Sequence, residues 1–274
     1  MKNTKQTDNH PFRTGNHPFR TGPARLPALV TVLLAVLLLT PAEQSGAQTF
    51  TLEAETGGLW FSRNDVRIPN EGGTRFDMID LIGSDFAPYY RLRLNMQILE
   101  HHKVRILFAP LTKSGTGIIV QEGPVLFANS EFASGIPLKG TYRFNTYRIT
   151  YRYTFYDRGP WKLGAGLAGL IRDAKVQLVQ DGRSDQDTDL GFVPLVHLFA
   201  SRTLTDRLWV QLDAETLAGP QGRATDAALT VHYHLRDHLA LFTGYRVLEG
   251  GADVDQVYNF SWINFLPFGL IWTF

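Results

Sequence analysis

The chain has 274 residues and a nearly balanced charge, with 27 Lys and Arg against 26 Asp and Glu. This balance excludes the strongly basic face that nucleic-acid binding requires, and the absence of cysteine excludes stabilisation by disulfide bonds. Hydrophobic residues make up 44% of the chain and aromatic residues 12%. No partner of nucleic-acid type is therefore expected.

The N-terminal segment has the organisation of a secretory signal. Five basic residues precede an apolar run over 26–39, Pro41 ends the run, and small residues follow at 45–47. The run is short for a membrane-spanning helix, which needs about 20 residues. The pattern predicts a signal peptide over 1–47, cleaved after Ala47. The remaining domain, 48–274, then holds 22 basic and 24 acidic residues, because the leader removes five and two.

The rest of the chain alternates between apolar and polar residues, as β-strands with one apolar face do. In the first such segment Phe50, Leu52 and Ala54 share one face, and Glu53 and Glu55 lie on the other. Ten segments of this kind are predicted, around 50–55, 90–98, 104–108, 147–155, 163–168, 192–202, 208–215, 227–234, 239–247 and 258–274.

The connections between these segments alternate in length. Short turns are predicted at 101–102, 157–160, 204–206 and 236–237. Long connections are predicted at 62–86, 113–140, 179–190, 218–223 and 249–257. Strict alternation indicates ten antiparallel strands with both chain ends on one side. Eight strands are possible if single strands have been split, and twelve if 73–81 and 118–127 are separate strands.

The last strand ends on an aromatic residue at the chain end. Its apolar residues occupy every second position, at Leu266, Phe268, Leu270, Trp272 and Phe274. With the leader and the alternating strands, this ending resembles bacterial outer-membrane β-barrel proteins as a class. The resemblance implies an all-β, closed, antiparallel up-and-down barrel in the outer membrane of a Gram-negative bacterium, surrounded by lipid and lipopolysaccharide. It also implies that Leu270, Trp272 and Phe274 form an assembly signal for the barrel-insertion machinery.

A water-soluble sandwich or lipocalin-like barrel would also alternate, but it would place its charged residues outside. The string of tyrosines argues for a membrane barrel, because tyrosine and tryptophan gather at membrane interfaces. We expect an interface belt from Tyr142, Tyr147, Tyr151, Tyr153, Tyr156 and Trp161.

The polar faces of the predicted strands carry many charges, which the barrel would turn inward. Ten strands enclose a narrow lumen, and buried charges persist only when they are paired. We therefore expect a largely filled lumen with a charge network of Glu53, Glu55, Arg91, Arg93, Arg105, Arg148, Arg152, Arg172, Asp213, Glu215, His232, His234 and Arg246.

Three kinds of function remain open on this sequence. The favoured one is an outer-membrane barrel of structural or surface-interaction type. The second is a narrow channel or small-ligand transporter whose arginine-rich wall would select anions. The third is a barrel enzyme acting on lipid A, phospholipid or peptide. His197 and Ser201 share a face but lie about 13 Å apart along a strand, which is too far for a direct proton relay. Asp77, Asp80 and Asp85 are expected at the rim, but no histidine accompanies them to complete an Asp-His pair. No catalytic residue, cofactor or metal site is therefore predicted.

One acidic cluster falls in a predicted external loop. Asp181, Asp185, Asp187 and Asp189 could hold a divalent cation, but their spacing lacks the glycine of an EF-hand. A solvated acidic loop is the favoured interpretation.

Overall fold

A computed structural model describes residues 49–274 of the chain. The predicted signal peptide, 1–47, lies outside the described residues and stays a prediction. No helix within the described part is long and apolar enough to cross a membrane.

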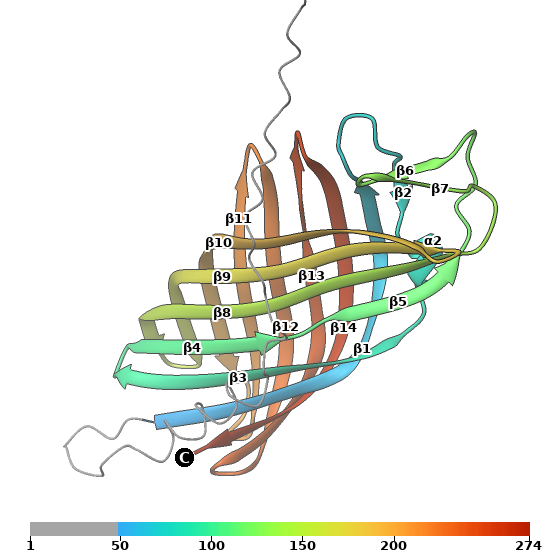
Figure 1. The fold of residues 1–274 in the computed structure, drawn as a ribbon. Coiled ribbons are helices and arrows are strands. Elements are labelled where there is room, and N and C mark those ends of the chain that lie inside the picture. Colours follow the sequence, from blue (N-terminus) through green and yellow to red (C-terminus); the bar gives the residue numbers. More distant parts are fainter. Residues whose placement is uncertain (1–48) are drawn as a thin grey trace, which may run out of the picture. The chain divides into compact units, whose positions relative to one another are not determined.

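Ten strands pair with antiparallel neighbours around a closed ring, which confirms the predicted fold class (Figure 1). The ring closes where the first strand pairs with the last, from Thr51 with Thr273 to Arg67 with Tyr258. In chain order its members are β1 (Thr49–Arg67), β3 (Ala87–Leu99), β4 (His102–Ala109), β8 (Leu138–Arg158), β9 (Trp161–Gln180), β10 (Arg183–Thr203), β11 (Leu208–Gly219), β12 (Gly222–Arg236), β13 (Leu239–Val254) and β14 (Val257–Thr273).

The remaining elements lie at one end of the barrel. A further strand, β5 (Thr112–Gly117), continues from β4 along β8. The segment 68–86 carries β2 (Phe76–Asp77) and the single-turn helix α2 (Ile79–Ile82), and the segment 118–137 carries the hairpin of β6 (Val125–Phe127) and β7 (Ser130–Phe132). We call this the loop end.

Both ends of the described chain meet at the opposite end of the barrel, which we call the terminal end. Phe50 and Phe274 exchange two backbone hydrogen bonds of 2.9 and 3.0 Å, and their rings stack. The turns here are short, over 100–101, 159–160, 204–207 and 237–238. Lipid cannot hydrogen-bond a free strand edge, so tying the last strand to the first suits a sheet that lies in a membrane.

Three connections at the loop end differ from the prediction. The predicted long loops at 179–190, 218–223 and 249–257 are tight turns at 181–182, 220–221 and 255–256, because the flanking strands continue. The acidic cluster is therefore part of a hairpin, with Asp185, Asp187 and Asp189 on β10.

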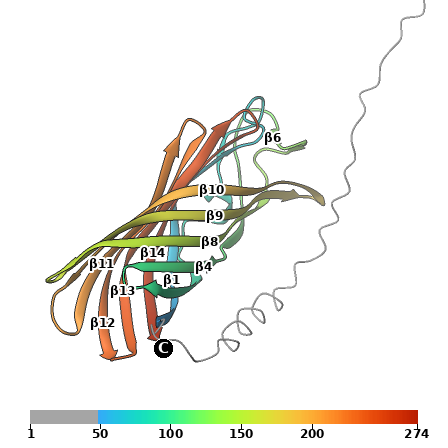
Figure 2. The same ribbon diagram turned by 90° about the vertical axis from the view of Figure 1, so that its left-hand side faces the viewer.

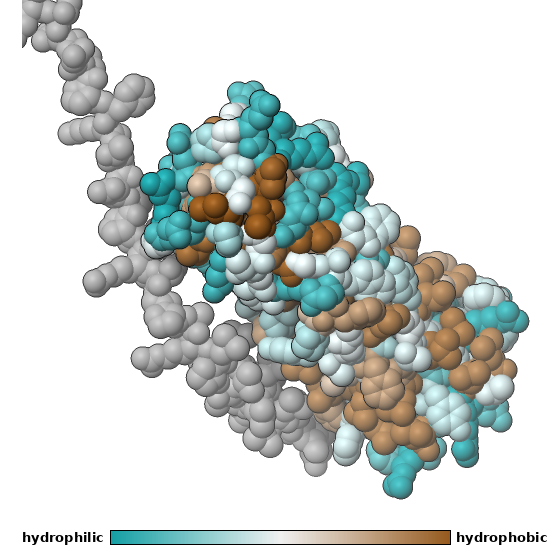
Figure 3. Space-filling view, turned by 90° about the vertical axis from the view of Figure 1, so that its right-hand side faces the viewer, coloured by the Kyte–Doolittle hydropathy of each residue, from teal (hydrophilic) through white to brown (hydrophobic). Residues whose placement is uncertain are grey.

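The outward face of the barrel is apolar. Leu167 is 68% exposed and Ile149 is 61% exposed, and comparable residues recur on every side. Figure 3 shows brown residues over the barrel wall and mostly hydrophilic residues at the loop end. This arrangement contradicts a water-soluble sandwich, which would place such residues inside. Tyr151 and Tyr153 face outward as expected, but Tyr142 is buried in the interior and is not a belt residue.

Candidate functional site in the barrel interior

Ten oppositely charged side chains fill the middle of the barrel, and we call them the charge layer. They come from seven strands and make ten ion pairs among themselves. The five arginines are Arg91, Arg93, Arg105, Arg148 and Arg246, and the five carboxylates are Glu53, Glu55, Asp213, Glu215 and Asp226. The numbers are equal, so the layer carries no net charge.

Asp226 joins three arginines. Its Oδ1 accepts a hydrogen bond from Arg246 at 2.7 Å, and its Oδ2 accepts from Arg91 at 2.7 Å and from Arg148 at 3.0 Å. The side chain of Asp226 is 2% exposed. A carboxylate so far from water is tolerated only with partners on both oxygens.

Glu55 holds a second group of arginines. Arg246 donates to both of its oxygens, at 3.2 and 3.0 Å, and Arg93 lies 2.8 Å away. The Tyr89 hydroxyl donates to Oε1 at 3.0 Å. Glu55 therefore links β1 to its neighbour β3 and, past β14, to β13.

Arg105 bridges Asp213 and Glu215 on the far side of the interior. It donates to the two carboxylates at 2.7 and 2.6 Å, and Arg148 also pairs with Glu215. Thr150 donates to Glu215 at 2.6 Å. Because both carboxylates alternate with outward residues on β11, the strand's own geometry brings them to one arginine.

Four residues that the sequence places in the network lie outside the layer. Arg152 makes no ion pair with any described residue, and its guanidinium lies 3.6 Å from the Phe199 ring centroid. Arg172 pairs with Asp189 nearer the loop end. His232 stacks between Trp209 and Phe242, and His234 lies against Trp209.

One member of the layer, Asp226, was missed by the sequence analysis. The predicted strand began at Ala227, whereas β12 begins at Gly222. Asp226 continues the inward series of Ala228, Thr230 and His232. Extending the alternation by one step would have found it.

A histidine next to the layer raises the question of a metal ion. His197 Nδ1 lies 3.9 Å from Asp213 and 3.7 Å from Glu215, a group of three potential ligands. Both carboxylates already accept hydrogen bonds from Arg105. The Arg105 guanidinium already lies between these two carboxylates and neutralises their charge, so the three residues do not fit a metal cation.

An apolar plug closes the interior on the loop-end side of the charge layer. Phe61, Tyr142 and Ile263 point inward from the strands and are at most 2% exposed. Side chains of the two loop-end segments pack against them, among them Phe76, Met78, Leu81, Val125, Phe127 and Phe132. The apolar plug and the charge layer therefore occupy successive levels of the barrel interior.

A polar cavity occupies the terminal-end side of the charge layer. Its volume is about 500 Å³, and polar side chains from all around the barrel line it. Lys103 and Arg152 both face it, and they are direct cross-strand partners on β4 and β8. Like charges directly opposite each other are destabilising, and Lys103, like Arg152, makes no ion pair with a described residue.

No family model and no curated protein matches the chain. Its structure is similar to that of the outer-membrane protease OmpT of Escherichia coli, with a TM-score of 0.50, 8% identity, and coverage of 84% of this chain and 99% of that one. Neisserial surface protein A matches with a TM-score of 0.34, 12% identity and coverage of 82% and 97%. Ail of Yersinia pestis matches with a TM-score of 0.36, 9% identity and coverage of 84% and 100%.

The apolar outer face, the closed ring of ten strands and the likeness to OmpT define the class. The fold is that of the outer-membrane β-barrel proteins. At 8% identity the likeness concerns the fold alone, and the OmpT activity does not carry over with it. The loop-end segments 68–86 and 118–137 contain no histidine. The rim aspartates Asp77 and Asp85 have other partners in the structure. Asp77 accepts a hydrogen bond from the backbone of Ile79 at the start of α2, and Asp85 pairs with Lys113.

Proposed function

We propose that the protein is an integral outer-membrane barrel with a sealed lumen, of structural or surface-interaction type. The observation that carries this proposal is the charge layer, in which five arginines and five carboxylates neutralise one another across the interior. Charges that are already paired leave no free field to attract a permeating ion. The apolar plug adds a second barrier on the loop-end side.

The proposed orientation places the terminal end in the periplasm and the loop end outside the cell. Short periplasmic turns and longer external connections are the rule for such barrels. Lipid and lipopolysaccharide would surround the apolar wall. The strand that ends in Leu270, Trp272 and Phe274 would be the assembly signal for the insertion machinery.

An apolar patch at the loop end favours the surface-interaction form of this proposal. Val120 is 81% exposed and Ile118 is 48% exposed, and Leu126 and Ile136 lie on the same segment. Figure 3 shows brown residues among hydrophilic ones at this end. Exposed apolar clusters of this kind are typical of contact sites.

The location and orientation can be tested with single cysteines, because the chain contains none. Gln221 lies in a loop-end turn and Asp206 in a terminal-end turn, and both are exposed. In intact cells a membrane-impermeant maleimide should label Gln221→Cys at once, and Asp206→Cys only after permeabilisation. The reverse pattern would overturn the orientation, and recovery of both variants in the soluble fraction would overturn the location.

A second candidate function is the binding of a small anion in the terminal-end cavity. Lys103 and Arg152 favour it, since both are cations without an ion-pair partner and face the same space. Inorganic phosphate should raise the unfolding temperature of the protein and should lose this effect in Arg152→Gln. The matched control is Arg202→Gln, because Arg202 is exposed and lies over the Trp161 ring. Equal stabilisation of both variants would contradict the site.

A further inference from the structure

The barrel wall is interrupted between β10 and β11. The two strands pair only from Val196 with Thr216 to Thr203 with Trp209. Beyond Val196, β10 continues to Arg183 and pairs with β9 alone. Figures 1 and 2 show the strands β8 to β10 diverging from β11 to β14 toward the loop end. One edge of β10, over 183–195, therefore has no partner strand among the described residues.

The sequence gives a reason for the end of this ladder. The next pairs would be Leu195 with Leu217 and Pro194 with Ala218, by continuation of the observed register. A proline has no backbone N–H, so it is tolerated in a sheet only where its nitrogen needs no partner strand. Pro194 keeps its place opposite Gly169 of β9, and the missing pairing is on the β11 side.

The gap begins at a depth where the outward face is still apolar. Phe192 is 70% exposed and Leu190 is 76% exposed, and both alternate outward with Val196 and Leu198. Polar residues take over the outward positions only at Thr188, Gln186 and Ser184. The first part of the gap thus faces hydrocarbon, where an open strand edge is tolerated only beside a cavity or another partner.

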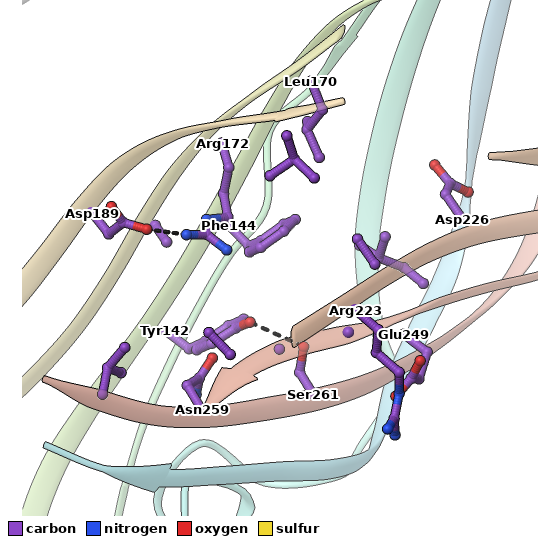
Figure 4. Close-up of a pocket in the computed structure, with 18 of the residues that line it drawn as sticks. Tyr142, Phe144, Leu170, Arg172, Asp189, Arg223, Asp226, Glu249, Asn259 and Ser261 are labelled. Carbon is purple, nitrogen blue, oxygen red and sulfur yellow. Dashed lines mark hydrogen bonds and ion pairs between the residues drawn. The ribbon is translucent and has the colours of Figure 1, made fainter. Parts of the chain in front are cut away.

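A narrow groove lies behind the gap, inside the barrel wall (Figure 4). Its cavity volume is about 100 Å³. The apolar part of its lining comes from both sides of the gap, with Phe144, Leu170, Val193, Leu195, Leu248 and Val257.

Charged pairs border the same groove. Arg172 pairs with Asp189 on one wall, as Figure 4 shows, and Arg223 pairs with Glu249 at 2.7 Å on the outward side of the other. Lys175 and Asp187 add a charge of each sign. The groove therefore combines an apolar lining with hydrogen-bonding groups, as an amphiphile requires.

We propose that this groove binds a segment of one acyl chain of an amphiphile that enters sideways from the outer leaflet through the gap between β10 and β11. The chain would lie against the apolar lining, and its polar head would remain among the charged pairs. A membrane lipid and a free fatty acid share this chemistry. The inference goes beyond the sealed-lumen proposal and rests on its membrane location.

The test uses the full-length protein in lipid vesicles with a photoactivatable palmitate, and in a second arm a phospholipid that carries the same chain. After irradiation, mass spectrometry identifies the labelled residues. We expect labels on groove residues such as Val193 and Leu248 in at least one arm, and the arm that labels identifies the source. Labels confined to outward residues such as Leu190 and Phe192 in both arms would mean ordinary boundary lipid and would overturn the groove.

Matched variants on one strand separate binding from misfolding. Ala224→Trp would fill the groove, whereas Ala227→Trp places the same side chain on the outer face of β12. Groove labelling should fall about tenfold in the first variant, equivalent to about 1.4 kcal/mol, and stay unchanged in the second. Unchanged labelling in both would overturn the proposal.

A second variant pair covers the case in which Ala224→Trp does not fold. Val193→Phe acts on the opposite wall of the groove, with the outward Val196→Phe as its control. The same selective loss of groove labelling is expected, and equal labelling would overturn the proposal. The cysteine experiment tests the membrane location separately, so the two failures are distinguishable.

Discussion

Asp226 accepts a hydrogen bond from Arg246 at 2.7 Å in the middle of the barrel, where neither side chain is more than 6% exposed. The two residues lie on neighbouring strands, β12 and β13. Asp226 also receives Arg91 and Arg148 from the opposite wall. This single carboxylate therefore links both sides of the charge layer.

Replacing Asp226 by Asn should be among the most damaging single changes in the barrel. The variant leaves five buried arginines with four carboxylates, and breaking a buried pair by removing one partner costs about 3–5 kcal/mol. Urea unfolding in detergent or vesicles measures the difference in free energy of unfolding. The control is Asp206→Asn in an exposed turn, which should change it by less than about 0.5 kcal/mol. Equal stabilities would mean that water enters the layer.

Two glutamates two residues apart should differ in their contribution to stability. The side chain of Glu55 is fully buried beside Arg91, Arg93 and Arg246, whereas that of Glu53 is 15% exposed and borders the terminal-end cavity. Glu55→Ala should cost about 3–5 kcal/mol. Glu53→Ala should cost less, about 1–3 kcal/mol, because Arg93 keeps its ion pair with Glu55. The same unfolding measurement compares them, and a larger loss for Glu53 would contradict the assigned burial.

The plug depends on a close approach between α2 and β5. A Cβ added at Gly117 would clash with the backbone carbonyl of Asp80, so only glycine allows this contact. Gly117→Ala should destabilise the protein by about 1–3 kcal/mol, as overpacking does. Gly219→Ala is the matched control, because a Cβ there meets nothing within 4 Å. Hydrogen exchange should also rise over 79–85 in the Gly117 variant alone.

A pH dependence is expected where Asp85 anchors the end of the α2 segment. Lys113 donates to the Asp85 carboxylate at 3.1 Å and to the Gly83 carbonyl at 2.9 Å. The hydrogen bond and charge of Lys113 lower the pKa of Asp85 below its ordinary value. Because the pKa is lowered in the folded state, the ionised carboxylate stabilises the docked α2 segment above about pH 4, the ordinary pKa of an aspartate. This stabilisation is lost as the pH falls through the lowered pKa.

Hydrogen exchange over 79–85, corrected for its intrinsic pH dependence, checks this expectation. Protection should weaken on acidification in the unmodified protein. In Asp85→Asn, protection should already be weaker at neutral pH. Acidification should then cause no further loss of protection from the titration of residue 85. An identical acid response in both proteins would show that Asp85 is not the responsible group.

Strand number and facing could be predicted from the sequence because the membrane requires one apolar face. On β8, for example, Tyr151 is exposed and Arg148 is buried, as the alternation indicates. The alternation is no longer informative where that contrast ends. In β10 both faces become polar above Leu190, so alternation no longer distinguishes a continuing strand from a loop. The backbone ladder nevertheless continues to Arg183, since pairing with β9 needs no apolar face.

The partners within the interior could be predicted only for neighbouring strands. Glu53 lies directly opposite Arg93 in the β1–β3 register, so that pair follows from adjacency. Arg148 meets Asp226 from the opposite wall, 78 residues along the chain. Such pairs depend on the stagger of all the strands around the ring. The same dependence explains why Arg172 pairs outside the layer.

Conductance across a planar bilayer tests the central claim, a sealed lumen, most directly. A control first shows that the protein is folded: before heating, it should resist unfolding in detergent. We then expect no discrete current steps, because the charge layer and the plug close the interior. Discrete steps whose size or ion selectivity changes when Arg91 or Arg148 is replaced would contradict the account and establish an aqueous pore.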